Sequence, residues 1–128
     1  MASGASLRGA REVRGKIQKI HKNLPDEVGR ALYIETEIEL KEVKRRTPVD
    51  TGELRASEHT VGPIRRWRNI YTEIVAGGPA APYAIYVHED PDAFHKVGQW
   101  KYIESVLFES RPFMAARVAK RIELARVV

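Results

Sequence analysis

The chain has 128 residues, of which 43% are hydrophobic and 30% are charged, and its formal net charge is +5. This length predicts one domain with one hydrophobic core. The lack of cysteine excludes a disulfide framework, a thiolate nucleophile and a cysteine-ligated zinc ion. The sequence contains neither the apolar segment of a secretory signal nor an apolar run of about 18 residues that could span a bilayer, so we expect a soluble, cytoplasmic protein.

The first predicted element is a basic amphipathic helix. Apolar residues recur from Leu7 to Leu24 at intervals of three and four residues, and Arg and Lys occupy many of the positions between them. This spacing places a narrow apolar stripe along one face of a helix. We expect residues 1–6 to be disordered and residues 7–128 to form a single domain.

A second helix is predicted from Pro25 to about Arg46. Proline fits the first turn of a helix, and the carboxylates of Asp26 and Glu27 favour the positive end of the helix dipole. The helix must end at or before Thr47, because the proline that follows Thr47 disfavours the helical conformation in the residue before it.

The remainder of the chain predicts a small sheet and a closing helix. Residues 52–57 can form one helical turn, and the β-branched and aromatic residues of 58–64 and 67–77 alternate roughly as in antiparallel strands. Ser110 can cap a final helix that begins near Pro112. The order of elements predicts an α+β fold with long N-terminal helices, a small antiparallel β-sheet of three to four strands and a C-terminal helix.

The joint between the long helix and the sheet reads TPVDTGELRAS, residues 47–57. Asp50-Thr51-Gly52 is the tripeptide that carries the catalytic carboxylate of aspartic proteases. In those enzymes a buried apolar strand enters the loop, whereas here a charged helix and a proline precede it. A retropepsin-like aspartic protease is therefore kept only as an alternative.

A turn explains the same residues. Asp50 can accept backbone hydrogen bonds, Gly52 can adopt a positive φ, and Leu54 can anchor the turn in the core. We interpret the following residues as a structural turn: Thr47, Pro48, Asp50, Thr51, Gly52 and Leu54.

TPVDTGELRAS, preceded by LKEVKRR, resembles the signature of the HK97 gp10-like phage proteins. Three further segments resemble parts of that family: APYAIYVHED at residues 81–90, GQWKYIE at 98–104, which resembles a closing strand or turn, and PFMAARVAKRI at 112–122, which resembles the terminal helix. Many members continue the tyrosine-alanine segment with glutamate, phenylalanine and glycine. This chain reads VHEDP at that point, a departure that bears on the contacts of the loop.

The resemblance implies a structural protein of a tailed bacteriophage or prophage, not an enzyme, that needs no cofactor. It implies a place in the neck, as part of the head-tail connector, or in completion of the tail. The partners would be copies of the chain in a homo-oligomeric ring, portal, adaptor or head-closure proteins, and tail tube or terminator proteins. Genome DNA would pass through the lumen, and no membrane would be involved. The expected location is the virion, and the host cytoplasm during assembly.

Two clusters invite other interpretations. His88, Glu89 and Asp90, with Asp92 and His95, suggest a metal hypothesis, but they lie in and beside a predicted loop without HExxH spacing, and we predict no metal site. The segment 65–68 surrounds a tryptophan with three arginines, the combination that contacts phosphates and stacks on bases. A basic nucleic-acid-binding module is therefore the main alternative. In a ring, the same cations would meet acidic residues of a neighbouring subunit or ring.

Aromatic residues complete the set of candidate contacts. We interpret Tyr83, Tyr86, Trp100 and Tyr102 as core and subunit-contact residues, although residues 82–87 fit either a short helix or a strand. The candidate interface consists of Arg55, Arg65, Arg66, Trp67, Arg68, Tyr83, Tyr86, His88 and Glu89.

Overall fold

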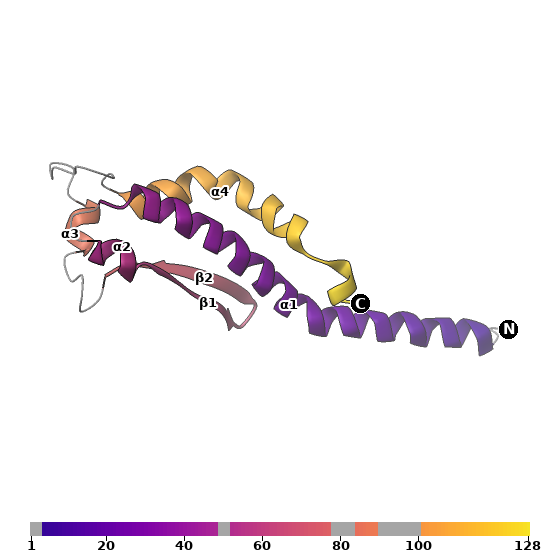
Figure 1. The fold of residues 1–128 in the computed structure, drawn as a ribbon. Helices are drawn as coiled ribbons and strands as arrows, with labels where there is room; N and C mark the ends of the chain where they lie inside the picture. The colour runs from indigo at the N-terminus through magenta and orange to yellow at the C-terminus, as the bar shows by residue number, and fades with distance from the viewer. Residues whose placement is uncertain (1–3, 49–51, 78–83, 90–100) are drawn as a thin grey trace.

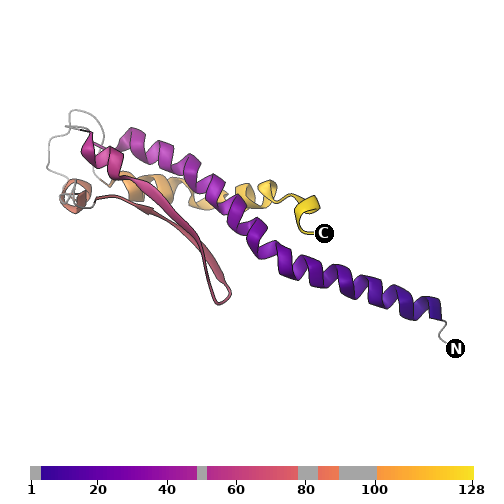
Figure 2. The same cartoon turned by 60° about the horizontal axis from the view of Figure 1, so that its bottom comes forward.

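The structure is a computed structural model that describes residues 4–48, 52–77, 84–89 and 101–128. One long helix, α1 (Gly4–Arg46), runs the length of the molecule (Figure 1). A β-hairpin packs along one side of its C-terminal half and a second long helix, α4 (Tyr102–Arg121), along the other. The N-terminal half of α1 projects beyond this body, as both views show (Figure 2). Among the described residues, no helix has the length and apolar character needed to cross a membrane.

The prediction of two N-terminal helices is wrong, because α1 is continuous and contains Pro25. A proline inside a helix removes the hydrogen bond to the carbonyl four residues earlier. Here that carbonyl belongs to His21, an exposed residue that water can reach. The helix also begins at Gly4, so residues 4–6, for which disorder was predicted, are helical.

A short helix and a hairpin follow the joint. Helix α2 (Glu53–Ser57) confirms the predicted helical turn, and β1 (His59–Arg66) pairs with β2 (Asn69–Val75) as predicted. The strands are antiparallel, and the register is irregular between Val61 and Ile64. The α+β class is confirmed, but three to four strands are not, since the described part of the chain holds these two.

The C-terminal elements differ from the prediction. Residues 84–89 form the short helix α3 (Ala84–Glu89), which decides between the two predicted alternatives. Helix α4 begins ten residues before Pro112, so Ser110 does not cap it and the likeness of residues 102–104 to a closing strand or turn is not borne out. The Ser110 hydroxyl instead donates to the carbonyl of Leu107 at 3.2 Å, as a residue inside a helix can. A single 3-10 turn, η1 (Leu124–Arg126), ends the chain.

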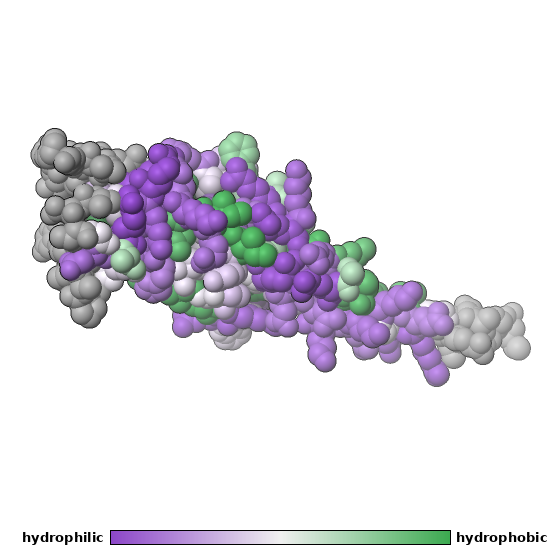
Figure 3. All heavy atoms as spheres, in the orientation of Figure 1, coloured by the Kyte–Doolittle hydropathy of each residue, from purple (hydrophilic) through white to green (hydrophobic). Residues whose placement is uncertain are grey.

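The hydrophobic core is small and lies at the end of the molecule where the joint is. Its members come from α1, α2, α3 and α4, and are Val43, Leu54, Ala84, Tyr102 and Val106, with Ile74, Ala76 and Ile103 packed beside them. On the face shown in Figure 3, hydrophilic residues predominate and apolar residues form separate patches. The aromatic Tyr102 is fully buried, which confirms its predicted place in the core.

Candidate assembly interface

The joint after α1 is held by Thr47, which is fully buried. Its backbone N–H and its hydroxyl oxygen both lie within hydrogen-bond distance of the carbonyl of Val43, at 2.9 and 2.7 Å. The same hydroxyl oxygen contacts Glu58 Oε1, in the residue that links α2 to β1. Thr47 thus ties the end of the long helix to the start of the sheet.

Glu58 is a buried residue of the joint that sequence reasoning missed. Its side chain is 2% exposed, and burial raises the pKa of its carboxyl, against the hydrogen bond from Thr47 and the charges of Lys44 and Arg55. Burial, followed by the charge of Glu58, also raises the pKa of Tyr102 to about 12. The Thr47 hydroxyl has one proton, which it can donate to the Val43 carbonyl or to Glu58 but not to both. A protonated Glu58 would donate to the Thr47 oxygen, so that both hydrogen bonds could form.

The central turn is described only in part. Gly52 has φ 86° and ψ −6°, the left-handed conformation that was predicted, and Leu54 is 4% exposed and anchors the turn as expected. Pro48 is half-buried. Asp50 and Thr51 lie outside the described residues, so their roles stay predictions. The residues before Pro48 are the end of α1 rather than a strand, as the turn interpretation requires.

Arg55 is turned toward the joint rather than presented as free surface. Its Nη2 donates to the carbonyl of Thr47 at 3.4 Å, and its buried Nε has no hydrogen-bond partner among the described residues. Ser57 completes this corner, because its hydroxyl donates to the Leu54 carbonyl at 2.6 Å and accepts the N–H of Gly77 at 2.9 Å. The end of β2 is therefore fixed to α2.

The tip of the hairpin presents the predicted cationic cluster to solvent. Arg65, Arg66 and Arg68 are exposed, and Trp67 is 92% exposed with φ 58°. Most of the indole surface of Trp67 is therefore open to a partner.

His88 and Glu89 form a polar cluster with α4. His88 Nδ1 lies 2.8 Å from Glu89 Oε1, and His88 Nε2 accepts the N–H of Glu104 at 3.4 Å, which is the tautomer with its proton on Nδ1. Lys101 bonds Glu89 at 2.7 Å and, followed by His88, lowers the pKa of that carboxyl.

These bonds give both side chains a structural role. Among the described residues, no group of three or more His, Asp and Glu residues could hold a metal ion. The other residues of the metal hypothesis, Asp90, Asp92 and His95, lie outside the described part of the chain. So do Tyr83 and Trp100, and the structure describes only the backbone of Tyr86, in α3.

A stripe of buried carboxylates on α1 was also missed. Glu27, Glu35 and Glu39 recur at multiples of four residues on the face that buries Ala31, and each is at most 6% exposed. Arg30 bonds Glu27 at 2.5 Å, and Arg121 of α4 bonds Glu35 at 2.5 Å. The spacing was a usable signal, because acidic residues on a buried face require cationic partners elsewhere.

The C-terminal segment closes over the first of these carboxylates. Glu27 Oε1 accepts the backbone N–H of Glu123 at 3.0 Å, and Arg30 also donates to the carbonyl of Arg121 at 2.9 Å. The hydrogen bond from Arg30, then that from Glu123, lowers the pKa of Glu27 to about 2. The carboxylate is thus held in its charged form against α1.

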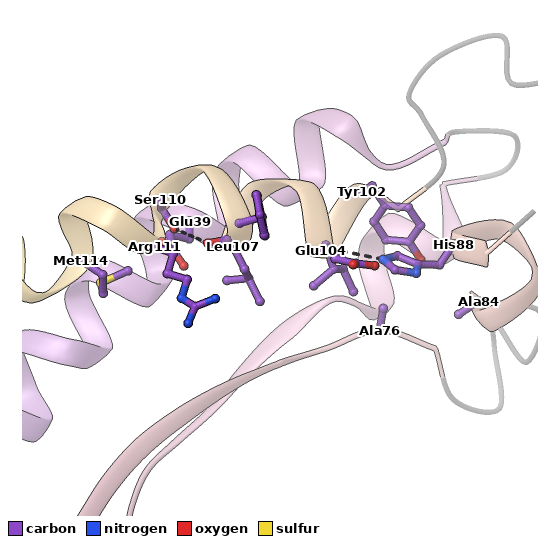
Figure 4. A pocket seen from close by; sticks show the side chains of 12 residues that line it. Glu39, Ala76, Ala84, His88, Tyr102, Glu104, Leu107, Ser110, Arg111 and Met114 are labelled. Atoms are coloured by element: carbon purple, nitrogen blue, oxygen red, sulfur yellow. Dashed lines mark hydrogen bonds between the residues drawn. The ribbon is translucent and has the colours of Figure 1, made fainter. Parts of the chain in front are cut away.

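An apolar groove of about 720 Å³ lies between α4, α3 and the end of β2 (Figure 4). Leu107 and Met114 of α4, Ala76 and Ala84 line it, with Glu39 of α1 on the same wall as Ser110. Burial raises the pKa of Glu39, and its Oε1 has no hydrogen-bond partner among the described residues. The groove is thus an open apolar surface beside a buried carboxyl oxygen that lacks a partner.

The projecting part of α1, residues 4–24, is called the arm below. Its predicted apolar stripe is uncovered, since Val13, Ile17 and Leu24 are 57%, 59% and 37% exposed. The cations of the arm from Arg11 to Lys22 are exposed as well. Comparisons with protein-family models, with curated proteins and with solved structures find no match to this chain.

Proposed function

We propose that the chain is a structural protein of a tailed bacteriophage or prophage that assembles as a ring in the neck or completes the tail. The observation that carries the proposal is the arm, a long helical extension whose apolar residues have no cover in a single copy. Exposed apolar surface of this kind is typical of protein interfaces. The HK97 gp10-like resemblance of residues 47–57 supports the same assignment.

The joint supports this proposal without any catalytic role. Thr47, Gly52 and Leu54 have structural tasks that account for their place in TPVDTGELRAS. A rigid joint would hold the hairpin at a fixed orientation to α1, which an assembly with defined register needs. The predicted third and fourth strands would add at the edges of the hairpin, where backbone groups are available for pairing.

The expected partners are further copies of the chain, portal, adaptor or head-closure proteins, and tail tube or terminator proteins. The expected location is the virion, with genome DNA passing through the lumen. The test is deletion of the gene, with the wild-type gene supplied on a plasmid as the control. Unjoined heads and tails in electron micrographs, with loss of infectious titre, are the expected result. Normal infectious virions from the deletion would refute the proposal.

A basic nucleic-acid-binding module is the second candidate, favoured by the exposed Trp67 among three arginines. Binding through phosphate contacts weakens steeply as salt rises. Duplex DNA titrations at two salt concentrations should therefore distinguish wild type from an Arg66→Glu variant. Arg117→Glu, on exposed surface of α4, is the matched control. Absence of salt-dependent binding by the wild type would eliminate this candidate.

A further inference from the structure

The arm carries the whole net charge of the protein. Residues 1–24 contain six Lys and Arg and one Glu, whereas residues 25–128 contain sixteen Lys and Arg and sixteen Asp and Glu. A cationic rod with an uncovered apolar stripe therefore projects from an electrically neutral body. Such a helix requires a partner that is apolar in the middle and offers carboxylates.

The groove beside α4 has these properties. Leu107 and Met114 supply apolar surface, Glu104 lies on the lining, and the buried Glu39 Oε1 has no hydrogen-bond partner among the described residues. Arg111 is the one arginine among the lining residues that the structure describes. Lys101 bonds Glu104 at 2.9 Å, so Glu39 is the carboxyl of the lining that an incoming cation would meet. Burial raises the pKa of Glu39, and a cation beside it would favour the charged form, which suits a basic amphipathic helix better than an acidic one.

The lengths of the two surfaces agree. The part of the stripe from Val13 to Leu24 is eleven residue steps long, and the α4 wall of the groove from Tyr102 to Met114 is twelve. At 1.5 Å per residue, these span about 17 and 18 Å. One copy of the stripe would therefore cover the groove from end to end.

The arm cannot fill the groove of its own chain. Helix α1 is continuous from Gly4 to Arg46, and its N-terminal half leads away from α4 (Figures 1 and 2). Pairing of two arms is disfavoured for a different reason. Arg14 and Lys16 flank the stripe on its two sides, so a pair of arms would bring like charges together along the seam.

We propose that the arm of one copy docks in the α4 groove of a second copy, with the stripe against Leu107 and Met114 and an arm cation beside Glu39. This is a helix-in-groove contact. It is heterologous, because two different surfaces meet, and repetition of such a contact gives a ring where the rotation closes. The formation of a ring rests on the proposed function. The docking of the arm does not, since it is a property of the isolated protein.

The lack of cysteine allows a cross-linking test on the full chain without background thiols. A disulfide forms only where two Cα atoms lie within about 7 Å. Ile17→Cys protein is mixed with Leu107→Cys protein, or with Ser110→Cys protein, and oxidised with diamide. Leu107 and Ser110 lie on either side of the groove centre. Ile17→Cys should therefore react with one of them if the arm runs in one direction along α4, and with the other if it runs in the opposite direction.

The expected product is a covalent dimer in one of the mixtures. A double variant that carries Ile17→Cys and the reactive groove cysteine in the same chain should give a ladder of larger species. Gln18→Cys, whose side chain lies off the stripe, is the matched control and should give little product. Lys16→Glu should reduce the yield, whereas Lys22→Glu, on the opposite face of the arm, should change it less. All four positions of the arm are exposed, so these changes leave the body intact.

Two results would overturn the inference. One is the absence of a mixed dimer in both mixtures at the highest soluble protein concentration. The other is dimer formation by Ile17→Cys alone, which would show that arms pair with arms. Neither result depends on virion assembly, and normal virions from the gene deletion would refute the proposed function while leaving the cross-linking result unchanged.

Discussion

The left-handed conformation of Gly52 allows a prediction whose magnitude depends on the backbone alone. A Cβ built at Gly52 meets no atom of the described residues within 4 Å, so Gly52→Ala adds no steric clash there. The remaining cost is that of holding a non-glycine residue at φ 86°, which is about 1–2 kcal/mol. We expect Gly52→Ala to lower the free energy of unfolding by that amount.

Urea denaturation followed by circular dichroism measures this difference. Gly52→Asn is the matched control, because asparagine tolerates the left-handed region better than alanine and should lose less stability. Gly52→Val should lose more than alanine, since a β-branched side chain is bulkier near the backbone. An unchanged free energy of unfolding for Gly52→Ala, at an equal slope with denaturant, would refute the proposed geometry of the turn.

Four further substitutions test other parts of the structure. Leu54→Ala should cost about 2–5 kcal/mol by denaturation, because Leu54 is 4% exposed in the core. Glu58→Gln should leave stability unchanged or raised at pH 7. The pKa of the Glu58 carboxyl is raised in the folded protein, so wild-type stability falls as pH rises above the pKa of an unfolded glutamate, about 4.3. The amide of glutamine does not titrate and removes this dependence. The pH dependence contributed by Glu27 has the opposite sign. Its pKa of about 2 lies below the unfolded value of about 4.3, so its contribution to stability is present above about pH 4.3 and is lost as pH falls toward 2. Glu27→Gln should therefore make stability less dependent on pH in that interval. Trp67→Ala should change stability by no more than about 0.5 kcal/mol, because the side chain is 92% exposed, and a larger loss would mean that the indole packs on the hairpin.

Local signals were sufficient to predict the joint and the hairpin. Gly52 and Leu54 have the predicted roles: Gly52 adopts a positive φ between α1 and α2, and Leu54 is the apolar anchor of the turn. The two strands were found from β-branched and aromatic residues on either side of a turn. In these segments the local preference and the final structure agree.

The helix boundaries failed because proline was interpreted as the start of a helix. Both Pro25 and Pro112 lie inside helices. The carbonyls that lose a hydrogen bond belong to His21 and Phe108, which are exposed, so water compensates part of the loss. Upstream of Pro112, burial of Tyr102 in the core favours a longer helix than the local signal indicated.

The exposed surface and the internal contacts around the joint were predicted only in part. The exposed hairpin tip was found, because a run of three arginines and a tryptophan is visible in the sequence. The contact of Glu58 with Thr47, and of Glu27 with the C-terminal segment, could not be found in this way. These pairs depend on how distant segments meet, which no local pattern encodes.

The arrangement around α1 has a consequence for sequence variation. The hairpin and α4 both pack on this one helix, through pairs such as Thr36 with Thr72 and Arg46 with Glu109. Substitutions that restore a lost contact should therefore appear as correlated changes between α1 and the hairpin, or between α1 and α4. Away from the core near the joint, the hairpin and α4 should vary independently of each other, so that natural selection can alter one surface without disturbing the other.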